Sequence, residues 1–161
     1  MRRTRIDALI ALGSNLGDRR NHVESALSAI ADLPDTRLLR ASRLIETAPL
    51  AGGEPNQRAY LNAAAIVETR LKPRALLDLL LQIERDHGRT RKPGRRWASR
   101  TLDLDLVMYD TMVLDTPGLT LPHPRMHERR FVLEPCAQIA PWARHPVTGM
   151  TVLQMLGALR A

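Results

Sequence analysis

The chain is poor in cysteine and in aromatic residues, and each shortage narrows what it can be. Of its 161 residues, one is Cys, one is Phe, two are Tyr and two are Trp. Cys136 has no partner for an internal disulfide, which agrees with a reducing compartment, and we expect a cytoplasmic protein. Nucleic-acid binders usually interleave basic residues with stacking aromatics, so this composition favours a compact anionic ligand instead.

Long hydrophobic runs are also missing. The apolar stretch nearest the start covers residues 8–12, which is too short to span a membrane and does not resemble a signal peptide. We therefore expect no membrane role. A hydrophobic content of 44% in 161 residues suffices for one sizeable core, and we predict a single domain over residues 1–161.

Acidic residues are absent from residues 89–100, where the positive charge is concentrated. Of the net charge of +7, this segment accounts for six, since 7 − 6 leaves +1 for the rest. Its basic residues are Arg89, Arg91, Lys92, Arg95, Arg96 and Arg100. Arginine predominates, and its planar guanidinium binds phosphate oxygens in a bidentate manner. A solvated surface is the commonest origin of such a run, so the segment alone is moderate support for phosphate binding.

Two aspartates follow the basic segment on a predicted strand at residues 101–109. Side chains alternate along a strand, so Asp103 and Asp105 share one face, while Leu102, Leu104, Leu106 and Met108 share the other. Taken alone, such a pair is usually the polar face of a half-buried strand. Beside the basic segment, the pair predicts a Mg²⁺ site, because Mg²⁺ takes one or two carboxylates plus phosphate oxygens. The geometry permits two ions.

The remaining pattern predicts alternating strands and helices. The turn Gly13-Ser-Asn-Leu-Gly17 separates the first strand from a helix that Asp18 could cap and Pro34 ends. The expected elements are a strand at Ile6–Leu12, that helix, strands at Thr36–Thr47 and Tyr60–Thr69, a helix at Lys72–His87, the strand at 101–109, and a tail of short strands with a helix at Val152–Leu159. This order predicts an α+β fold, a ferredoxin-like βαββαβ sandwich with a short C-terminal extension of strands and helix.

RNA-recognition modules share that order, so a small RNA-binding module that clamps phosphates with the basic loop is the competing interpretation. Such modules stack bases on exposed aromatics of their central strands. The stretch Ile6–Leu12 has no aromatic residue, and Tyr109 is the only one on the strand expected beside it. These strands therefore offer few aromatic side chains on which RNA bases could stack.

Three polar residues, His123, His127 and Asn62, each have two possible roles. His123 and His127 have metal-ligand spacing, but Pro122 and Pro124 oppose a regular helix there, so His123 is better explained as a phosphate or nucleotide contact than as a zinc ligand. Asn62 is polar within an apolar strand and needs partners, either backbone groups or a ligand.

A series of motifs occurs in a fixed order along the chain. They are Gly13-Ser-Asn-Leu-Gly17, Glu46-Thr-Ala-Pro-Leu50, Tyr60-Leu-Asn-Ala-Ala64, Gln82-Ile-Glu84, Gly88-Arg-Thr-Arg91, Arg96-Trp97, Arg100-Thr-Leu-Asp-Leu-Asp105, Leu121-Pro-His-Pro124 and Arg129-Arg-Phe131. In these motifs the chain resembles the 6-hydroxymethyl-7,8-dihydropterin pyrophosphokinases of folate biosynthesis over nearly its whole length. The stretch from Arg100 to Asp105 is the most specific of them.

The resemblance implies transfer of pyrophosphate from ATP to the hydroxymethyl group of the pterin, leaving AMP, with two Mg²⁺ ions. It implies that Asp103 and Asp105 bind the metals and that Arg89 and Arg100 assist the transfer. The implied pterin-binding residues are Thr47, Pro49, Leu50, Tyr60, Asn62, Trp97 and Phe131. The implied ATP contacts are Gln82, Glu84, Arg91, Trp97, Arg100, Thr120, His123 and Arg129. The expected partners are these two small molecules, without nucleic acid or membrane.

The chain departs from the family pattern in three places. Ala98-Ser99 stand where a Gly-Pro pair is common, and the basic loop is longer by one residue in Lys92-Pro-Gly-Arg-Arg96. Gly118 replaces a basic residue that contacts ATP in some relatives, so that contact is not expected here. A stand-alone Mg-nucleotide hydrolase, which would form AMP without the pterin, is a further alternative.

Overall fold

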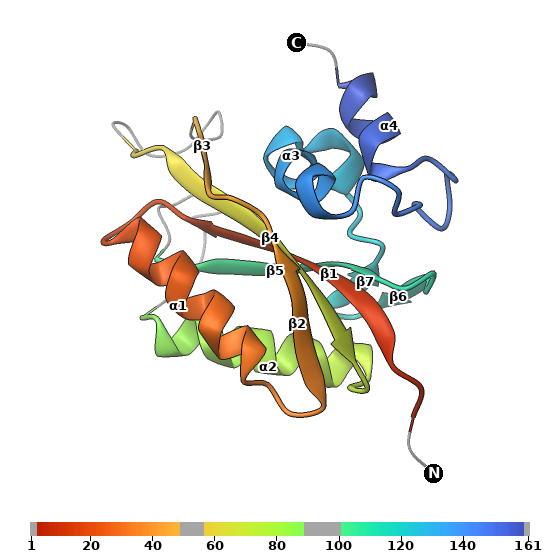
Figure 1. Cartoon of the computed structure of the whole chain (residues 1–161), viewed down its shortest axis with the longest axis horizontal. Helices are drawn as coiled ribbons and strands as arrows, with labels where there is room; N and C mark the ends of the chain where they lie inside the picture. Colours follow the sequence, from red (N-terminus) through yellow and green to blue (C-terminus); the bar gives the residue numbers. More distant parts are fainter. Residues whose placement is uncertain (1–2, 49–56, 89–100, 160–161) are drawn as a thin grey trace.

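The computed structural model describes residues 3–48, 57–88 and 101–159. It shows a five-stranded antiparallel sheet with helices on both faces (Figure 1). The strands run in the order β2-β4-β1-β5, and β3 pairs with the far end of β4. The strands of this sheet are β1 (Ile6–Ser14), β2 (Thr36–Ala41), β3 (Ile45–Thr47), β4 (Tyr60–Thr69) and β5 (Asp103–Tyr109).

Two hydrophobic layers sandwich the sheet because its central strands are apolar on both sides. On one face, Ile10 and Leu104 belong to a core that is closed by α1 (Arg19–Ala31) and α2 (Pro73–Asp86). On the other face, Leu9 packs in a second core with α3 (Arg130–Ile139) and α4 (Val152–Ala158). Figure 1 shows the two helix pairs on opposite sides of the sheet.

The predicted cap of the first helix is confirmed, and the second helix has clear start and end signals. The Asp18 carboxylate accepts a hydrogen bond from the backbone N–H of Asn21 at 3.1 Å, so it caps α1 as expected. Pro73 is the first residue of α2. Gly88 follows that helix with φ of 78°, a left-handed conformation that glycine adopts without strain.

The single strand predicted at Thr36–Thr47 is wrong, because the chain forms two strands with a break at Ser42. The Ser42 N–H donates to the Ala64 carbonyl oxygen (2.9 Å), and the Ala64 N–H donates to Ser42 Oγ (2.8 Å). A side-chain oxygen thus replaces a backbone acceptor, which shifts the register between β2 and β3 and keeps the buried Ala64 amide satisfied.

The expected position of Met108 is also wrong. Leu104 and Leu106 lie in the first core as predicted, but Met108 lies in the second core with Leu9. The register between β1 and β5 shifts between Leu9 and Ile10. The extra residue on β5 turns the side chains that follow onto the opposite face.

Helix α3 is absent from the predicted elements, although its apolar residues have helical spacing. Val132, Leu133, Cys136 and Ile139 are all buried in the second core. Pro135 lies inside this helix and removes one backbone donor. The short strands expected in the tail are confirmed as the hairpin β6 (Leu114–Thr116) and β7 (Leu119–Leu121), followed by a 3-10 turn at Met126–Glu128.

The structure is therefore a mixed α/β fold with an antiparallel sheet and four α-helices among the described residues. None of the helices in the described ranges is long and apolar enough to cross a membrane. Tyr109 is buried at 2% exposure, and its hydroxyl donates to the Leu71 carbonyl oxygen. It presents no ring on which a base could stack.

Candidate active site at one end of the sheet

The two aspartates predicted to bind metal lie on one face of β5, next to the central strand. Asp103 is opposite Gly13 of β1, and Asp105 is opposite Ala11. Both aspartates are half-buried, whereas the leucines between and beside them are buried in the first core. Because Ala11 belongs to the second core, the aspartates face the side of the sheet that carries α3.

Asn62 extends the row of residues that begins at Asp103. Gly13 pairs with Asp103 on one side and with Asn62 of β4 on the other. Neighbouring strands are about 4.8 Å apart, so the backbones at Asp103 and Asn62 are roughly 10 Å apart with Gly13 between them. The row places a carboxylate and an amide on the same face, separated by a residue that has no side chain.

The Asn62 amide is buried and oriented. Its residue is 5% exposed, and its Nδ2 donates to Thr47 Oγ1 of β3 at 2.5 Å. Thr47 itself pairs with Tyr60. Three of the residues predicted to contact the pterin, Thr47, Tyr60 and Asn62, are therefore brought together on β3 and β4. The expected partners of Asn62 were backbone groups or a ligand. The structure shows that one of its partners is the side chain of Thr47.

His123 lies beside β5 and is neutral at physiological pH. Its backbone N–H donates to the Val107 carbonyl oxygen (2.8 Å), and its Nδ1 accepts from the Arg125 N–H (3.2 Å). Burial is the main reason why the pKa of His123 is lowered to about 4; Arg129 and Arg125 act in the same direction, and Asp103 opposes them. Since Nδ1 accepts, the proton of the neutral ring resides on Nε2.

Arg129 and Phe131 lie together at the start of α3. The guanidinium carbon of Arg129 is 5.6 Å from the centre of the Phe131 ring, a cation–π contact. Phe131 also packs against the second core. The second core therefore holds the Phe131 ring in place, and the ring in turn holds the Arg129 guanidinium. Phe131 is predicted to contact the pterin, and Arg129 is predicted to contact ATP.

The other predicted ATP contacts lie on elements that touch β5. Gln82 and Glu84 belong to α2, and Thr120 belongs to β7. Both elements contact β5. However, α2 lies against the opposite face of the sheet, so it does not place Gln82 and Glu84 on the face of Asp103. Gln82 is exposed and bonds to Asp86 and Arg85, while Glu84 is buried at 2% exposure.

Six predicted site residues lie outside the described residues. They are Pro49, Leu50, Arg89, Arg91, Trp97 and Arg100. In the described part of the chain, no group of three or more His, Cys, Asp and Glu side chains is arranged to hold a metal ion.

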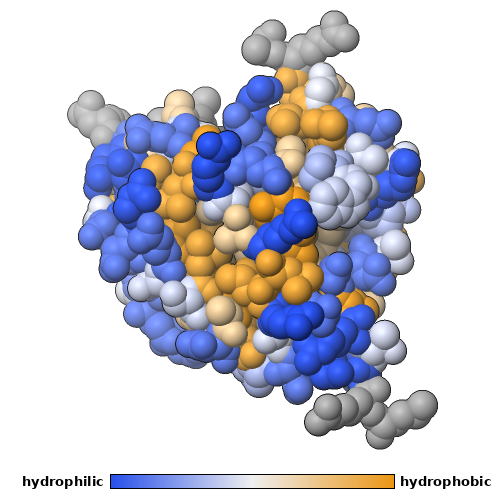
Figure 2. Space-filling view, in the orientation of Figure 1, coloured by the Kyte–Doolittle hydropathy of each residue, from blue (hydrophilic) through white to orange (hydrophobic). Residues whose placement is uncertain are grey.

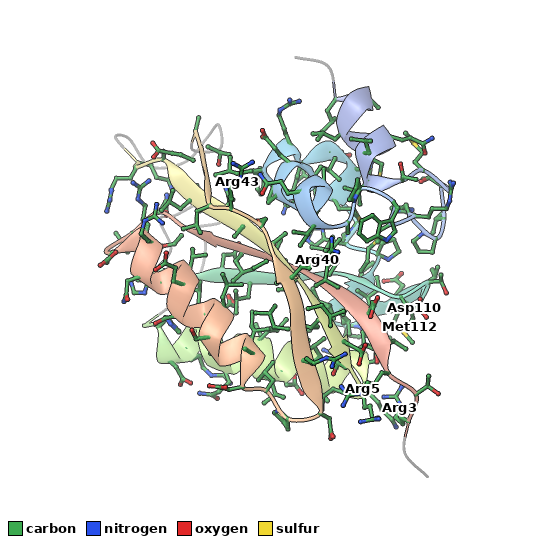
Figure 3. The ribbon with its side chains drawn as sticks, in the orientation of Figure 1. Arg3, Arg5, Arg40, Arg43, Asp110 and Met112 are labelled. Carbon is green, nitrogen blue, oxygen red and sulfur yellow. The ribbon has the colours of Figure 1, made fainter. Side chains whose placement is uncertain are left out.

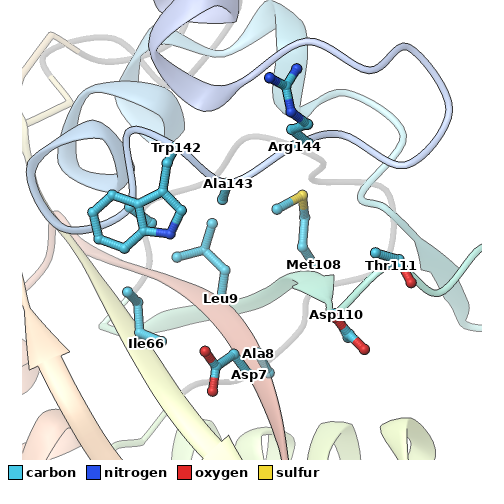
Figure 4. A pocket seen from close by; sticks show the side chains of 11 residues that line it. Asp7, Ala8, Leu9, Ile66, Met108, Asp110, Thr111, Trp142, Ala143 and Arg144 are labelled. Atoms are coloured by element: carbon cyan, nitrogen blue, oxygen red, sulfur yellow. The ribbon is translucent and has the colours of Figure 1, made fainter.

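A cavity at the other end of the sheet is separate from these residues. It has a volume of about 190 Å³, and Figure 4 shows Leu9 and Met108 pointing from the sheet toward Ala143 of the segment that carries Trp142. None of the predicted site residues lines it. Asp7, at its edge, is six residues from Gly13 along β1, which is about 20 Å of strand.

Acidic and basic side chains lie at the same end of the sheet as this cavity. Figure 2 shows a band of hydrophobic side chains across this face of the molecule, with hydrophilic ones on both sides. Figure 3 shows Asp110 at the same end of the sheet as Arg3 and Arg5. Burial, then Glu68 and Asp110, raise the pKa of Asp7.

The fold and the site together define a mixed α/β protein whose polar side chains gather at one end of an antiparallel sheet. Residues 9–141 match the family model described as 7,8-dihydro-6-hydroxymethylpterin-pyrophosphokinase (HPPK). This chain belongs to that family. The resemblance seen in the sequence motifs is thus confirmed.

Two bacterial pyrophosphokinases are similar to this chain over most of their length. The 2-amino-4-hydroxy-6-hydroxymethyldihydropteridine pyrophosphokinase of Pseudomonas aeruginosa is 44% identical over 137 residues, which are 85% of this chain and 82% of that protein. The protein of the same name from Haemophilus influenzae is 44% identical over 135 residues, which are 84% and 82% of the two chains. Both relatives are pyrophosphokinases by name, so the chain is similar to enzymes.

Solved structures with the same fold are more distant in sequence. The crystal structure of Plasmodium falciparum HPPK-DHPS wild type with pterin and p-hydroxybenzoate has a TM-score of 0.75 and 14% identity, covering 98% of this chain and 42% of that one. The crystal structure of Plasmodium falciparum HPPK-DHPS wild type has a TM-score of 0.73 and 12% identity, covering 96% of this chain and 45% of that one. The chain spans less than half of these longer proteins, and the likeness supports the fold alone.

Proposed function

We propose that the protein is an ATP-dependent diphosphotransferase that transfers pyrophosphate from ATP to the hydroxymethyl group of 6-hydroxymethyl-7,8-dihydropterin. The products are AMP and the pterin diphosphate, and the pathway is folate biosynthesis. Membership of the pyrophosphokinase family over residues 9–141 is the observation that carries this proposal. Relatives of that name that are 44% identical over more than 80% of both chains support it.

Asp103 and Asp105 are the proposed ligands of two Mg²⁺ ions. Mg²⁺ is a hard cation that usually takes one or two protein carboxylates and completes its shell with water and phosphate oxygens. The donor set fits this chemistry, because both carboxylates are half-buried on one face of β5. When bound, Mg²⁺ neutralises charge on the phosphate oxygens.

The pterin is proposed to bind over β3 and β4, next to Asn62. The ring edge of a pterin carries N–H donors, and the buried amide of Asn62 offers its Oδ1 because Nδ2 is engaged by Thr47. Tyr60 and Phe131 supply aromatic surface for the flat ring. Pro49, Leu50 and Trp97 complete the proposed pterin-binding set.

ATP is proposed to contact residues around β5, the strand that touches both α2 and β7. A neutral His123 donates a hydrogen bond through Nε2 without adding charge. Arg129 supplies a guanidinium for phosphate oxygens. The further proposed contacts are Gln82, Glu84, Arg91, Trp97, Arg100 and Thr120. Arg89 and Arg100 are proposed to stabilise the negative charge that develops during transfer.

The chemical step is an in-line attack of the pterin hydroxyl oxygen on the β-phosphorus of ATP. A bond from this oxygen to phosphorus forms, the bond between the α-phosphate oxygen and the β-phosphorus breaks, and AMP leaves. Asp103 is the proposed acceptor for the hydroxyl proton. Positioning and electrostatic stabilisation provide most of the acceleration in reactions of this type.

The same proposal includes a ferredoxin-like arrangement of the sheet, a single domain and a cytoplasmic location. The strand order β2-β4-β1-β5, with one helix pair on one face, is the order expected of a ferredoxin-like sandwich. We propose that residues 1–161 form one domain, a ferredoxin-like βαββαβ sandwich with a C-terminal extension of strands and helices that includes α3 and α4. A cytoplasmic location agrees with the single buried Cys136.

An omission assay tests the function. Purified protein is mixed with ATP, Mg²⁺ and the hydroxymethyl-dihydropterin, and each component is left out in turn while AMP and the pterin diphosphate are quantified. The proposal requires equal amounts of both products, and only in the complete mixture. AMP without the pterin would instead identify a nucleotide hydrolase. Salt-sensitive RNA binding without either product would identify a nucleic-acid-binding module.

A further inference from the structure

The cavity at the far end of the sheet has an apolar floor and is large enough for one aromatic ring. Its volume is about 190 Å³, and an apolar cavity of about 150 Å³ already holds a benzene molecule. Leu9, Ile66 and Met108 line it from the sheet, with exposed fractions of 3%, 8% and 6%. Ala143 faces them from the segment after α3 (Figure 4). The cavity therefore offers a ring-sized molecule a surface away from water.

A strand irregularity turns Met108 into this cavity. The register between β1 and β5 shifts between Leu9 and Ile10, and Met108 pairs with Leu9 beyond the shift. Regular alternation would place Met108 in the first core with Leu104 and Leu106. Bulges re-aim side chains and are frequent next to active sites, and methionine adapts its shape to what it contacts. The bulge therefore gives the cavity an adaptable wall.

Trp142 forms another wall of the cavity without belonging to a core. Its exposed fraction is 61%. Among the described residues, those in and around the second core include Ala140 and Ala143 but not Trp142. The guanidinium carbon of Arg40 lies 5.9 Å from the indole ring centre, a cation–π contact that restrains the ring. Core packing does not explain this exposed indole, whereas tryptophan is enriched where a protein binds another molecule.

The charge at the edge of the cavity favours a cation. Asp7 and Asp110 both line it, and the Asp110 N–H donates to the Asp7 carbonyl oxygen (2.8 Å), which keeps the two residues together. Within the described ranges, no basic side chain lies within ion-pair distance of either carboxylate. Burial, then repulsion from Glu68 and Asp110, raises the pKa of Asp7. A bound cation would relieve this repulsion.

The basic side chains of this region have other contacts. Arg5 and Arg37 pair with Glu68 at 3.4 and 3.5 Å. Arg144 lines the cavity, but its Nη1 donates to the Gly149 carbonyl oxygen at 2.8 Å, and Figure 4 shows the side chain turned away from the sheet. The unpaired charge among the groups at the edge is therefore negative.

We propose that this cavity is a second binding site, which takes a small aromatic amine in its ammonium form. The ring lies on the three apolar side chains of the sheet, beside the Trp142 indole. The ammonium group lies at the edge, near Asp7 and Asp110. The site is about 20 Å along β1 from Gly13, so it is distinct from the proposed pyrophosphate-transfer site and does not depend on that function.

A titration with phenethylammonium tests the site on the whole protein labelled with ¹⁵N. We expect saturable shifts of the Trp142 indole N–H and of the backbone amides of Leu9, Met108 and Ala143, with a Kd of about 1 mM or tighter. Phenylacetate, which has the same ring and the opposite charge, should bind at least about tenfold more weakly. A non-hydrolysable ATP analogue with Mg²⁺ should leave the Kd within about twofold, because the two sites are separate.

Asp110→Asn separates charge from shape. Asp110 has φ of 51°, a conformation that Asn also adopts readily, so the backbone should be preserved. We expect the Kd for phenethylammonium to rise by about fivefold, because one of the two carboxylates is lost. Asp78→Asn is the matched control: it removes the same charge from the exposed side of α2, on the other face of the sheet, and should bind like the parent.

Two further variants change the walls of the cavity. Ala143→Leu extends a side chain toward Leu9 and should abolish binding by filling the space. Trp142→Ala removes an exposed ring, so it should leave the fold intact and weaken binding by about fivefold or more. Circular dichroism checks the fold of each variant, and Trp142→Ala decides the matter if Ala143→Leu does not fold.

The inference is overturned if phenethylammonium causes no saturable shifts, or if the shifts lie around Asn62 and Asp103 instead of the cavity. Equal affinity for phenylacetate also overturns it, as does parent-like binding by both Asp110→Asn and Trp142→Ala. Formation of the pterin diphosphate is measured in a separate assay, so each of these results leaves the proposed function intact.

Discussion

The side-chain amide of Asn62 donates from Nδ2 to Oγ1 of Thr47 across the β3–β4 pair, at 2.5 Å. Because an amide has one donor end and one acceptor end, this bond fixes which end faces Thr47 and which faces Gly13. The acceptor Oδ1 is the end beside Gly13. The orientation of a buried polar group in the proposed substrate site is thus set by a neighbouring side chain before a substrate arrives.

Removing the hydroxyl at residue 47 should weaken pterin binding. We expect Thr47→Val to raise the KM for the pterin by about five- to tenfold, because the Asn62 amide loses the bond that orients it, worth about 1 kcal/mol or slightly more. The KM for ATP should change little. Thr47→Ser, which retains the hydroxyl, is the control and should behave like the parent. Equal pterin KM values for the two variants would refute the orienting role.

Much of this site follows from local sequence rules, and the exceptions have identifiable causes. The shared face of Asp103 and Asp105 follows from strand alternation, which is a local property. The reversed side of Met108 could not be predicted, because it depends on a register shift against Leu9 on a strand far away in sequence. Alternation remains valid only as far as the first bulge.

The break at Ser42 and the helix α3 were missed for different reasons. At Ser42, a side-chain oxygen takes the place of a backbone acceptor, and no propensity rule anticipates that pairing with Ala64. In α3 the apolar residues do show helical spacing, from Val132 to Ile139, but Pro135 argues against a helix interior. Packing of the apolar side against the sheet outweighs the lost hydrogen bond.

Ser42→Ala should lower the stability of the fold. The substitution leaves the Ala64 N–H, on a residue at 0% exposure, without its acceptor at Ser42 Oγ, and we expect a loss of about 1–3 kcal/mol. Urea denaturation monitored by circular dichroism measures it. Ser28→Ala, on the exposed side of α1, is the control and should be neutral or slightly stabilising. A Ser42→Ala midpoint within error of the parent would contradict this account of the strand break.

Acid should destabilise the protein in part through His123. Its pKa is lowered to about 4 in the folded chain, from 6.5, so the folded state takes up the proton later than the unfolded state. This contribution is complete above about pH 6.5 and declines as the pH falls toward 4. Discounted for partial exposure, the decline amounts to about 2 kcal/mol.

Denaturant unfolding at pH 7 and pH 4.5 checks this prediction for His123→Gln against the parent. The stability difference between the two pH values should be smaller in the variant. His127→Gln, which alters an exposed histidine nearby, should keep the parent's pH dependence. An unchanged pH dependence in His123→Gln would show that this ring is not the group responsible.

Asp7→Asn should stabilise the protein at neutral pH. Burial, Glu68 and Asp110 raise the pKa of Asp7, so its stability contribution is present in acid and is lost as the pH rises through its folded pKa. We expect the variant's Tm to exceed the parent's by about 2 °C at pH 7, and the gain to disappear near pH 3. Asp78→Asn, on the exposed side of α2, serves as the control. A gain of equal size at both pH values would contradict the electrostatic cause.

The central claim is that the carboxylates on β5 support pyrophosphate transfer, and Asp105→Asn tests it most directly. The substitution preserves shape and removes one charge, so circular dichroism should match the parent while AMP formation from ATP, Mg²⁺ and the pterin falls by about a thousandfold or more. Asp78→Asn should retain full activity. Parent-like turnover by a folded Asp105→Asn protein would contradict the account.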